Sequence, residues 1–271
     1  MTGTADYSNE LQSAIELARR GGRIASGHFR RDPQTKQKAD GTWVTEADWA
    51  VEAQIRLWIA RSFSDHNVLG EEEGLTAAGG GPPIEGAPTW IIDPIDGTNN
   101  YIAGIPIWAV LVALQVDGKN VVGVAHAPAL GETYDAAHGF GARRNGERLA
   151  VDPVDSLDVA TVILPGMESF YETGLGGFAG SLIGRSRRSR GFGDFWGHVL
   201  VAAGSAHVMV EPELSVWDFA ALEPIVTEAG GKMTALDGGS LVDGGSCLTT
   251  NGALHDEVIT LAKDLGRDAT P

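Results

Sequence analysis

The stretch WIIDPIDGTNNYIAGIPIWAVLVAL, residues 90–114, places a short polar insert between two apolar segments. The apolar segments, Trp90–Ile92 and Ile107–Leu114, are crowded with β-branched and aromatic residues and have no helical period, so they predict two buried strands. The insert carries Asp93 and Asp96, two carboxylates placed three residues apart at the end of a predicted buried strand. Such a placement raises the question of what these carboxylates bind.

The residues around the two carboxylates favour a compact anionic turn. Asp93 closes the predicted strand and stands at the rim of the sheet, where sites in α/β proteins usually form. Pro94 fixes φ at about −65°, and Gly97 permits a tight turn that brings Asp96 back beside Asp93. A hard cation such as Mg²⁺ prefers such oxygen ligands, and a helix beginning at Thr98 would offer N–H groups to a phosphoryl group. The alternative is a plain β-turn in which aspartate caps the backbone.

The composition limits the classes of function. A chain of 271 residues can form one large domain or two smaller ones, and we expect an N-terminal α+β half at 1–150 and a C-terminal α/β half at 151–271. Hydrophobic residues make up 43% and charged residues 21%, as in ordinary globular proteins. The net charge of −16 argues against nonspecific binding to nucleic acid or to an anionic membrane.

The single cysteine and the absence of long apolar runs predict a cytoplasmic protein. Cys247 has no partner for an internal disulfide, which fits a reducing compartment, and we expect it to be a small core residue. No N-terminal apolar region typical of a signal peptide and no apolar run of 18 residues is present, so neither a signal peptide nor a membrane span is predicted.

Helical and strand patterns alternate along the chain and predict an α/β or α+β enzyme. We expect a helix from Ser8 to Phe29 with Ser8 as N-cap, and a helix from Glu46 to Phe63 with Thr45 as N-cap. Further helices are expected after Gly193, from Trp217 to Ala229, and after His255. Additional strands are expected over the ranges Ala109–Val116, Val121–Ala127 and Ala206–Val210, with a hairpin at Gly139–Leu149 and a Gly/Pro loop at Thr76–Pro88.

Three further acidic segments occur in a fixed order around the 90–114 stretch. GEEEG, residues 70–74, places Glu71 in a run of like charges that is unfavourable unless water or a cation neutralises it. VTEAD, residues 44–48, offers Thr45 and Asp48, and VWDFAALEPIVTEAGG, residues 216–231, sets Asp218 at the start of an apolar helix. Each segment alone is also explained as a solvated loop or a helix cap. Their joint presence in this order favours a shared cation site.

Taken together, WIIDPIDGTNNY, SVWDFAALEPIVTEAGG, GEEEG and VTEAD resemble the inositol monophosphatase family of Mg²⁺-dependent phosphatases. The resemblance extends from Lys38 to Gly231. It implies a layered αβαβα sandwich, a dimeric assembly, and a small phosphorylated metabolite as substrate. The chemistry of the reaction agrees with a metal-dependent site. Phosphate monoesters hydrolyse very slowly without a catalyst, so an enzyme must concentrate positive charge and orient a water molecule.

The resemblance also implies a set of site residues. Glu71, Asp93 and the backbone carbonyl of Ile95 should hold a first Mg²⁺, and Asp93, Asp96 and Asp218 a second. Glu71 with waters would take a third, weaker ion. The catalytic residues implied are Asp48, Thr98 and Glu71, with Thr45 and Asp48 acting around the nucleophilic water and Thr98 as its nearer partner. The backbone amides of Gly97 and Thr98 should meet the phosphate.

The choice of phosphate ester depends on the segment before the last motif. Inositol phosphatases commonly carry a Thr-Ala pair where this chain has Asp194-Phe195. GDF followed by Glu211-Pro212 is instead similar to the bacterial histidinol-phosphate phosphatase branch. The ammonium and imidazole of histidinol phosphate would pair with carboxylates at Asp194 and Glu211, whereas inositol phosphate offers only hydroxyls. The alternative for Asp194 is a helix N-cap.

Other functions stay open at this stage. Within the enzymes, inositol-1-phosphate, fructose bisphosphate and 3′-phosphonucleotides are alternative substrates. The chain could also be a non-catalytic relative that regulates a larger complex, although every expected metal carboxylate is present. A plain Mg²⁺-binding or sugar-binding module is a third class, and Mg²⁺-dependent release of phosphate would exclude it.

Overall fold

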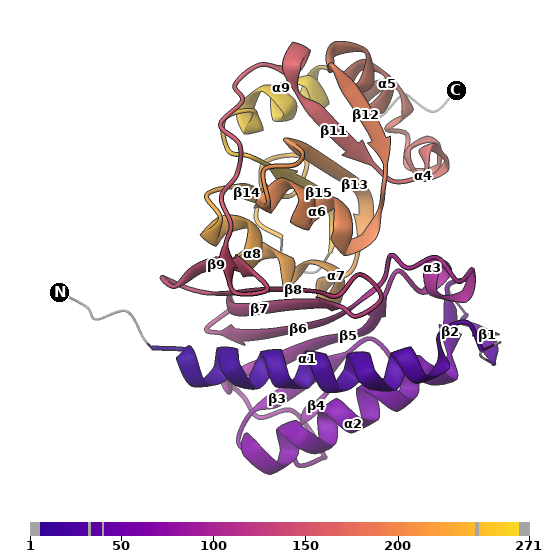
Figure 1. Cartoon of the computed structure of the whole chain (residues 1–271), viewed down its shortest axis with the longest axis vertical. Coiled ribbons are helices and arrows are strands. Elements are labelled where there is room, and N and C mark those ends of the chain that lie inside the picture. The colour runs from indigo at the N-terminus through magenta and orange to yellow at the C-terminus, as the bar shows by residue number, and fades with distance from the viewer. Residues whose placement is uncertain (1–5, 32–33, 40, 242–243, 266–271) are drawn as a thin grey trace.

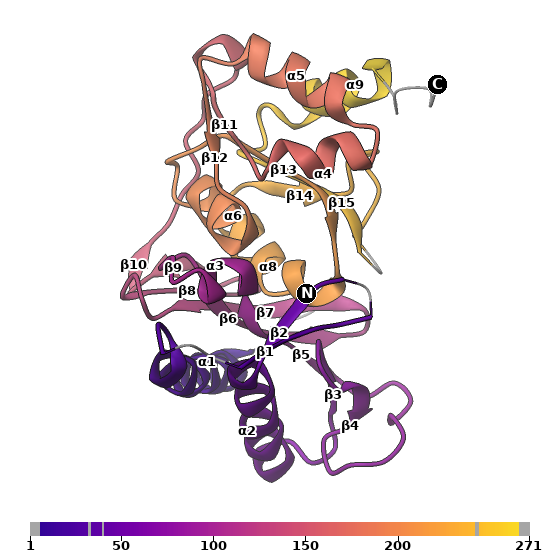
Figure 2. The same ribbon diagram turned by 90° about the vertical axis from the view of Figure 1, so that its right-hand side faces the viewer.

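A computed structural model describes residues 6–31, 34–39, 41–241 and 244–265. It consists of five stacked layers, alternately helical and β, which confirms the predicted αβαβα sandwich (Figure 1). Turned by 90°, the same layers are seen from the side, with the N-terminal helices below and the C-terminal helices above (Figure 2).

Helices form the first, third and fifth layers. The first layer contains α1 (Ser8–His28) and α2 (Glu46–Ser62), and the short α3 (Thr98–Ile102) lies at one side of the molecule, beside the larger sheet (Figure 1). The middle layer contains α6 (Asp194–Ala202), α7 (Val216–Phe219) and α8 (Leu222–Glu228). The fifth layer contains α4 (Met167–Glu172), α5 (Gly176–Arg185) and α9 (His255–Leu265). A 3₁₀ turn, η1 (Leu157–Val159), precedes the strands of the smaller sheet.

The larger sheet has eight strands in the order β10-β9-β8-β7-β6-β5-β3-β4. Their bounds are β3 (Asn67–Gly70), β4 (Gly74–Ala77), β5 (Thr89–Asp96), β6 (Ala109–Val116), β7 (Lys119–Ala127), β8 (Glu132–Ala137), β9 (Gly141–Arg144) and β10 (Glu147–Arg148). Only the β3–β5 pair is parallel, and the other neighbours are antiparallel. This sheet holds the motif from which the sequence analysis began.

The smaller sheet has five strands in the order β12-β11-β13-β15-β14. Their bounds are β11 (Thr161–Leu164), β12 (Arg188–Gly191), β13 (Val208–Leu214), β14 (Lys232–Thr234) and β15 (Gly245–Thr250). A separate hairpin of β1 (Thr35–Gln37) and β2 (Trp43–Thr45) connects the first two helices.

Separate apolar cores fill the spaces between the layers. On one face of the larger sheet, Trp90, Ile92 and Trp108 are buried against α1 and α2. On its other face, apolar residues of β5 to β9 pack against the middle helices, among them Phe195 and Phe219. Because both faces of the larger sheet are buried, its central strands are continuous apolar runs rather than alternating ones.

A glycine allows the middle helices to approach the larger sheet closely. Gly123 lies in β7, and a methyl group in its place would overlap the backbone carbonyl oxygen of Ala221, at the junction between α7 and α8. Only a residue without a Cβ fits this contact. The contact therefore seats α7, which carries Asp218, on the sheet that carries Asp93.

Most predicted elements are confirmed, and several differ from the prediction in their caps or bounds. Ser8 does not cap α1, because Tyr7 occupies the N-cap and the Ser8 N–H donates to Asp6 Oδ1 over 3.0 Å. The helix predicted over residues 217–229 is two helices, since Pro224 has no N–H to continue a helix through this segment. The predicted 206–210 strand begins and ends later, as β13.

The strand at the quoted stretch is longer than predicted. It continues through Asp93 to Asp96, and its pairing with β6 shifts register between these two residues. An irregular pairing of this kind turns both side chains out of the regular alternation. The two carboxylates thus come from a bulged strand end rather than from a turn after the strand.

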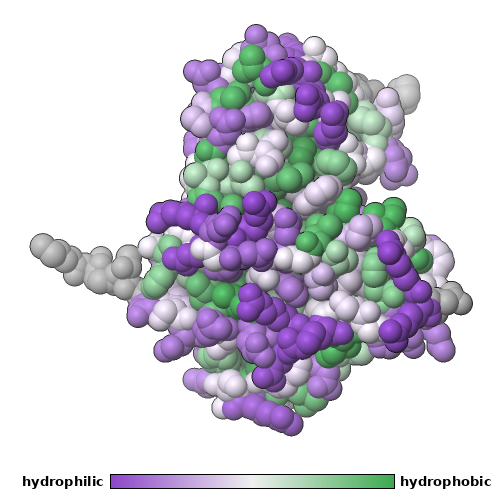
Figure 3. Space-filling model, in the orientation of Figure 1, coloured by the Kyte–Doolittle hydropathy of each residue, from purple (hydrophilic) through white to green (hydrophobic). Residues whose placement is uncertain are grey.

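The longest helix is amphipathic rather than uniformly apolar. Leu11, Ala14, Leu17 and Ala18 of α1 are buried against the larger sheet, while its outer face is largely hydrophilic (Figure 3). Within the described residues, no helix combines the length and apolar character needed to cross a membrane.

Candidate active site

A cleft of about 330 Å³ opens where the bulged end of β5 meets the starts of α3, α6 and α7. Both large sheets contribute to it, β5 from the larger sheet and β13 from the smaller one. The lining residues are mainly polar or acidic and are Lys38, Thr42, Trp43, Glu71, Asp93, Ile95, Asp96, Gly97, Thr98, Asn99, Asp194, Glu211, Glu213, Leu214, Ser215, Trp217 and Asp218.

Three carboxylates converge in this cleft. One oxygen each of Asp93, Asp96 and Asp218 lies within 4.8 Å of the others. A backbone N–H fixes each carboxylate: Ile95 donates to Asp93 Oδ1 at 3.0 Å, Phe195 donates to Asp96 Oδ2 at 2.7 Å, and Ser215 donates to Asp218 Oδ2 at 2.6 Å. Asp218 is therefore the third helical residue of a capping box in α7, not its N-cap, and its second oxygen is free to face the cluster.

Among the residues that the structure describes, no basic side chain forms an ion pair with a carboxylate of this cluster. Burial, followed by repulsion from Glu71, Asp96 and Asp218, raises the pKa of Asp93 well above its usual range. Burial also raises the pKa of Asp96, with Asp194 and Asp218 adding to the effect, and it raises the pKa of Asp218 to about 7 although the Ser215 N–H opposes the shift. Buried like charges at this distance need a counter-charge. An all-oxygen donor set of this kind fits a hard divalent cation.

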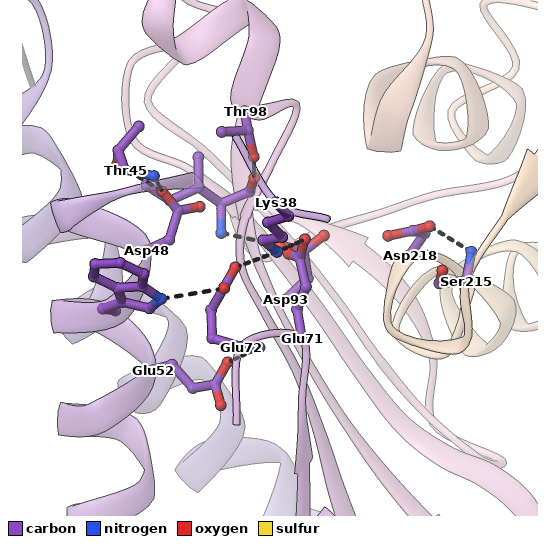
Figure 4. A network of polar contacts seen from close by, with 12 residues as sticks. Lys38, Thr45, Asp48, Glu52, Glu71, Glu72, Asp93, Thr98, Ser215 and Asp218 are labelled. Carbon is purple, nitrogen blue, oxygen red and sulfur yellow. Dashed lines mark hydrogen bonds and ion pairs between the residues drawn. The ribbon is translucent and has the colours of Figure 1, made fainter. Parts of the chain in front are cut away.

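Glu71 reaches the cleft from the β3–β4 turn and is ion-paired with a lysine. Lys38 Nζ lies 2.8 Å from Glu71 Oε1 and 2.7 Å from Glu72 Oε1 (Figure 4). Burial works against the charged lysine, but these two hydrogen-bonded carboxylates raise its pKa. Burial raises the pKa of Glu71 in spite of Lys38. The GEEEG segment is thus a partly buried, paired turn rather than a solvated loop.

A second buried acid underlies the same turn. Glu52 of α2 accepts from the N–H groups of Glu72 at 2.8 Å and Glu73 at 3.0 Å, and it pairs with Arg56 at 2.9 Å. Gly70 leaves room for this carboxylate, because a Cβ there would overlap it. Glu52 thereby fixes the turn that presents Glu71.

Asp48 forms the predicted capping box at the start of α2. Its Oδ2 accepts from Thr45 N at 2.8 Å and from Thr45 Oγ1 at 2.6 Å. Both residues are fully buried and are not among the residues that line the cleft. Asp48 Oδ1 has no hydrogen-bond partner within the described part of the chain, and burial raises the Asp48 pKa to about 7. The capping box thus uses only Oδ2 of this carboxylate and leaves Oδ1 without a hydrogen bond among the described residues.

The residues after Asp96 lie as the motif predicts. Gly97 is the N-cap of α3 with φ of 82°, a left-handed conformation that favours glycine. Thr98 Oγ1 donates to the Ile95 carbonyl oxygen at 2.9 Å, so the hydroxyl and this carbonyl, both predicted to act at the metal site, are in direct contact (Figure 4). Gly97, Thr98 and Ile95 all line the cleft.

Asp194 and Glu211 form a second acidic pair in the cleft. Asp194 begins α6 with φ of 58°, and Gly193 is the N-cap, so Asp194 is not a cap. Its N–H donates to Glu211 Oε1 at 3.0 Å, and its Oδ2 accepts from Asn100 Nδ2 at 2.9 Å. Burial and then repulsion from Glu211 raise the pKa of Asp194 to about 7. A left-handed aspartate is uncommon outside constrained sites.

Several residues of the site were missed in the sequence. Lys38 and Trp217 line the cleft, and Asn100 donates a hydrogen bond to Asp194 there, but the sequence analysis gave none of the three a role. Asn100 had a usable signal, because it follows the DPIDGT motif by two positions and so lies on the same short helix as Thr98.

Comparisons with known proteins identify the family. The inositol monophosphatase family model matches residues 6–267, so the chain belongs to this family, whose members depend on metal ions. A histidinol-phosphatase of Mycobacterium tuberculosis is 41% identical over 258 residues, covering 93% of this chain and 97% of that protein. A histidinol-phosphatase of Streptomyces coelicolor is 40% identical over 265 residues, covering 94% and 97%.

A solved structure agrees with these relatives. An IMPase of Thermotoga maritima shares 33% sequence identity, and the two chains superpose with a TM-score of 0.84 over 95% of this chain and 98% of that one. The resemblance inferred from the motifs is confirmed, and the chain is a phosphoric monoester hydrolase.

Proposed function

We propose that the protein hydrolyses histidinol phosphate to histidinol and phosphate with Mg²⁺ as cofactor. One observation carries this proposal: a pair of carboxylates, Asp194 and Glu211, lines the same cleft as the Asp93, Asp96 and Asp218 cluster. The Asp194–Glu211 pair suits a cationic leaving group. The three-carboxylate cluster suits a phosphate bound through metal cations. The names of the two most similar relatives given above support the same substrate.

The metal ligands follow from the carboxylates of the cleft. Glu71, Asp93 and the Ile95 carbonyl would hold one Mg²⁺, and Asp93, Asp96 and Asp218 a second, with Glu71 available to a third, weaker ion. Bound in this way, the ions would lower the pKa of a water and stabilise negative charge on the phosphate and its leaving oxygen. Asp93 is the carboxylate shared by the first two sites, in keeping with its complete burial among the other acids.

The chain itself would orient the attacking water and the ester. The free Oδ1 of Asp48 and the hydroxyl of Thr98 are the groups proposed to accept a proton from the water or align it. Thr45 holds the other Asp48 oxygen in place. The amides of Gly97 and Thr98 would donate to the phosphate oxygens.

Selection of the ester would depend on charge. Histidinol carries an ammonium group and an imidazole, and each forms a charge-assisted hydrogen bond with a carboxylate. A neutral cyclitol offers no counter-charge, so two carboxylates facing it would keep their desolvation cost without a gain. Asp194 and Glu211 therefore favour a cationic leaving group over inositol.

The proposal extends to the compartment, the assembly and the division of the chain. We propose that the protein is a cytoplasmic homodimer. Within each chain, an N-terminal half, 1–150, would carry most metal ligands, and a C-terminal half, 151–271, would carry the substrate residues. The free and buried Cys247 is compatible with a reducing compartment.

A comparison of phosphate esters tests the substrate. Purified protein is assayed for released phosphate with histidinol phosphate, inositol-1-phosphate, fructose bisphosphate and a 3′-phosphonucleotide, each with Mg²⁺ and with a chelator. We expect Mg²⁺-dependent turnover with the highest kcat/KM for histidinol phosphate. A higher kcat/KM for inositol-1-phosphate would transfer the assignment to the cyclitol phosphatases.

A further inference from the structure

We propose that His198 is a positioning residue that fixes the Glu211 carboxylate for the cationic part of the substrate. The proposal rests on the proposed role of Glu211 in binding the leaving group. It concerns a histidine that carries none of the roles assigned above and does not line the cleft.

His198 is buried behind Glu211 and bonded at both ring nitrogens. The residue has no exposed surface. Its Nε2 lies 3.2 Å from Glu211 Oε2, and its Nδ1 lies 2.8 Å from Thr249 Oγ1. Thr249 is itself fully buried in β15. The ring is thus held between a buried strand and the cleft, with no freedom to turn away from Glu211.

The chemistry of the contacts assigns the proton on the ring. An ionised carboxylate oxygen only accepts hydrogen bonds, so Nε2 must be the donor to Glu211. In a neutral ring, Nδ1 then accepts from the Thr249 hydroxyl, which can donate. The hydrogen bond made by one ring nitrogen fixes the state of the other. The Thr249 hydroxyl thereby keeps the proton of the neutral ring on Nε2, the nitrogen that faces Glu211.

Two donors on the same helix converge on Glu211. Asp194 and His198 are four positions apart in α6 and so lie on one face of the helix. The Asp194 N–H donates to Oε1 and the His198 Nε2 to Oε2, so one protein donor fixes each oxygen and each oxygen keeps further acceptor capacity. A carboxylate held at both oxygens has a fixed plane.

The arrangement answers an electrostatic problem of the cleft. Glu211 lines the same cleft as Asp194 and Asp218, so three carboxylates face one space. Hydrogen bonds donated to a carboxylate stabilise its charged form. His198 supplies such a bond from the buried side, where it occupies none of the space available to the substrate. A preorganised anion then binds a cation without first reorienting.

Substitutions at His198 separate positioning from folding. Asparagine retains a polar group near Nδ1 but cannot reach Glu211, whereas glutamine can place an amide N–H near the position of Nε2. With histidinol phosphate, we expect His198→Asn to raise KM about tenfold, the scale of one lost charged hydrogen bond, and to change kcat less than about threefold. We expect His198→Gln to recover most of the wild-type KM.

His255 offers a matched control. It is also buried, and it contacts two threonines, Thr250 at 2.9 Å and Thr234 at 3.1 Å, away from the cleft. His255→Asn makes the same chemical change in the same sheet region and should leave KM at the wild-type value. An equal rise of KM in both asparagine variants would overturn the positioning role.

A double-mutant cycle with Glu211→Gln distinguishes this inference from the proposed substrate. If His198 acts through Glu211, adding His198→Asn to Glu211→Gln changes KM less than about twofold, because the group being positioned is already altered. Additive effects would overturn the inference. If the wild type prefers inositol-1-phosphate, the substrate assignment fails, and the same cycle measured with that ester decides the role of His198 on its own.

Discussion

Replacing Asp194 with asparagine removes one charge from the proposed leaving-group subsite and changes little else. The side chain keeps its size, and by rotating its amide it can still present an oxygen to Asn100 Nδ2, 2.9 Å away in the wild type. Its N–H still donates to Glu211. The loss is a charged hydrogen bond to the substrate, about 1.5–3 kcal/mol, which corresponds to roughly a 10- to 150-fold fall in kcat/KM for histidinol phosphate.

The same substitution has an opposite effect on stability. The pKa of Asp194 is raised to about 7 in the fold from 3.8, so the folded state binds its proton more tightly than the unfolded chain. The ionised carboxylate therefore lowers the free energy of unfolding increasingly as pH rises from about 4 to 7. In a chelator-treated sample at pH 8, we expect the Tm of Asp194→Asn to equal or exceed that of the wild type.

Steady-state assays with two esters and thermal melts measure these effects. The substrate-specific result is a large fall in kcat/KM for histidinol phosphate with a change below about twofold for inositol-1-phosphate. Asp135→Asn is a matched control, since Asp135 is a buried aspartate in β8 with a raised pKa and lies outside the cleft. Equal losses for both esters would refute the reasoning and leave Asp194 with a structural role.

Five further substitutions test other parts of the molecule. Asp93→Asn should reduce kcat below a tenth of the wild-type value, which corresponds to a barrier increase above about 1.4 kcal/mol. The Tm measured in chelator should not fall. Turnover above a tenth of wild type would disprove the role of Asp93 as a shared metal ligand. Thr98→Ala and Asp48→Asn should each lower kcat about 10- to 100-fold with KM nearly constant, and a change confined to KM would remove that residue from the water-orienting group. Gly123→Ala should cost about 1–3 kcal/mol in urea unfolding, because the new methyl overlaps a helix-junction carbonyl; an unchanged midpoint would contradict the close contact. Burial, assisted by Arg19, lowers the pKa of His126 to about 4 from 6.5, so the unfolded chain takes up this proton first and stability falls as pH decreases from about 6.5 to 4. His126→Asn should make that fall shallower by up to about 3 kcal/mol, and parallel pH profiles would refute the assignment.

Local signals in the sequence predicted the elements that depend on neighbouring residues. Thr45 and Asp48 form the predicted capping box because both partners lie within one helical turn. The β6–β7 hairpin follows from two apolar runs on either side of Asp117-Gly118. At Ser8 the same reasoning failed, since a competing side chain, Asp6, takes its N–H.

Contacts between distant segments were the part that the sequence could not supply. Lys38 reaches Glu71 only because the β1–β2 hairpin lies over the β3–β4 turn, and no periodicity records that proximity. His198 reads as a lone histidine in an apolar helix, and its contact with Glu211 depends on the packing of α6 against β13. The carboxylates were found because each lies in a short acidic motif. Lys38 and Phe195, which contact Glu71 and Asp96, are distant from them in the sequence.

The register shift in β5 and the capping box in α7 have a consequence for biosynthesis. Asp93 and Asp96 leave the ribosome together, but Asp218 follows 122 residues after Asp96 (218 − 96), a delay of roughly 6–24 s at usual rates of translation. During that interval the nascent chain carries two crowded acids without their third partner. The cation site proposed for Asp93, Asp96 and Asp218 is therefore complete only after the segment that forms α7 has been synthesised and has packed on the larger sheet.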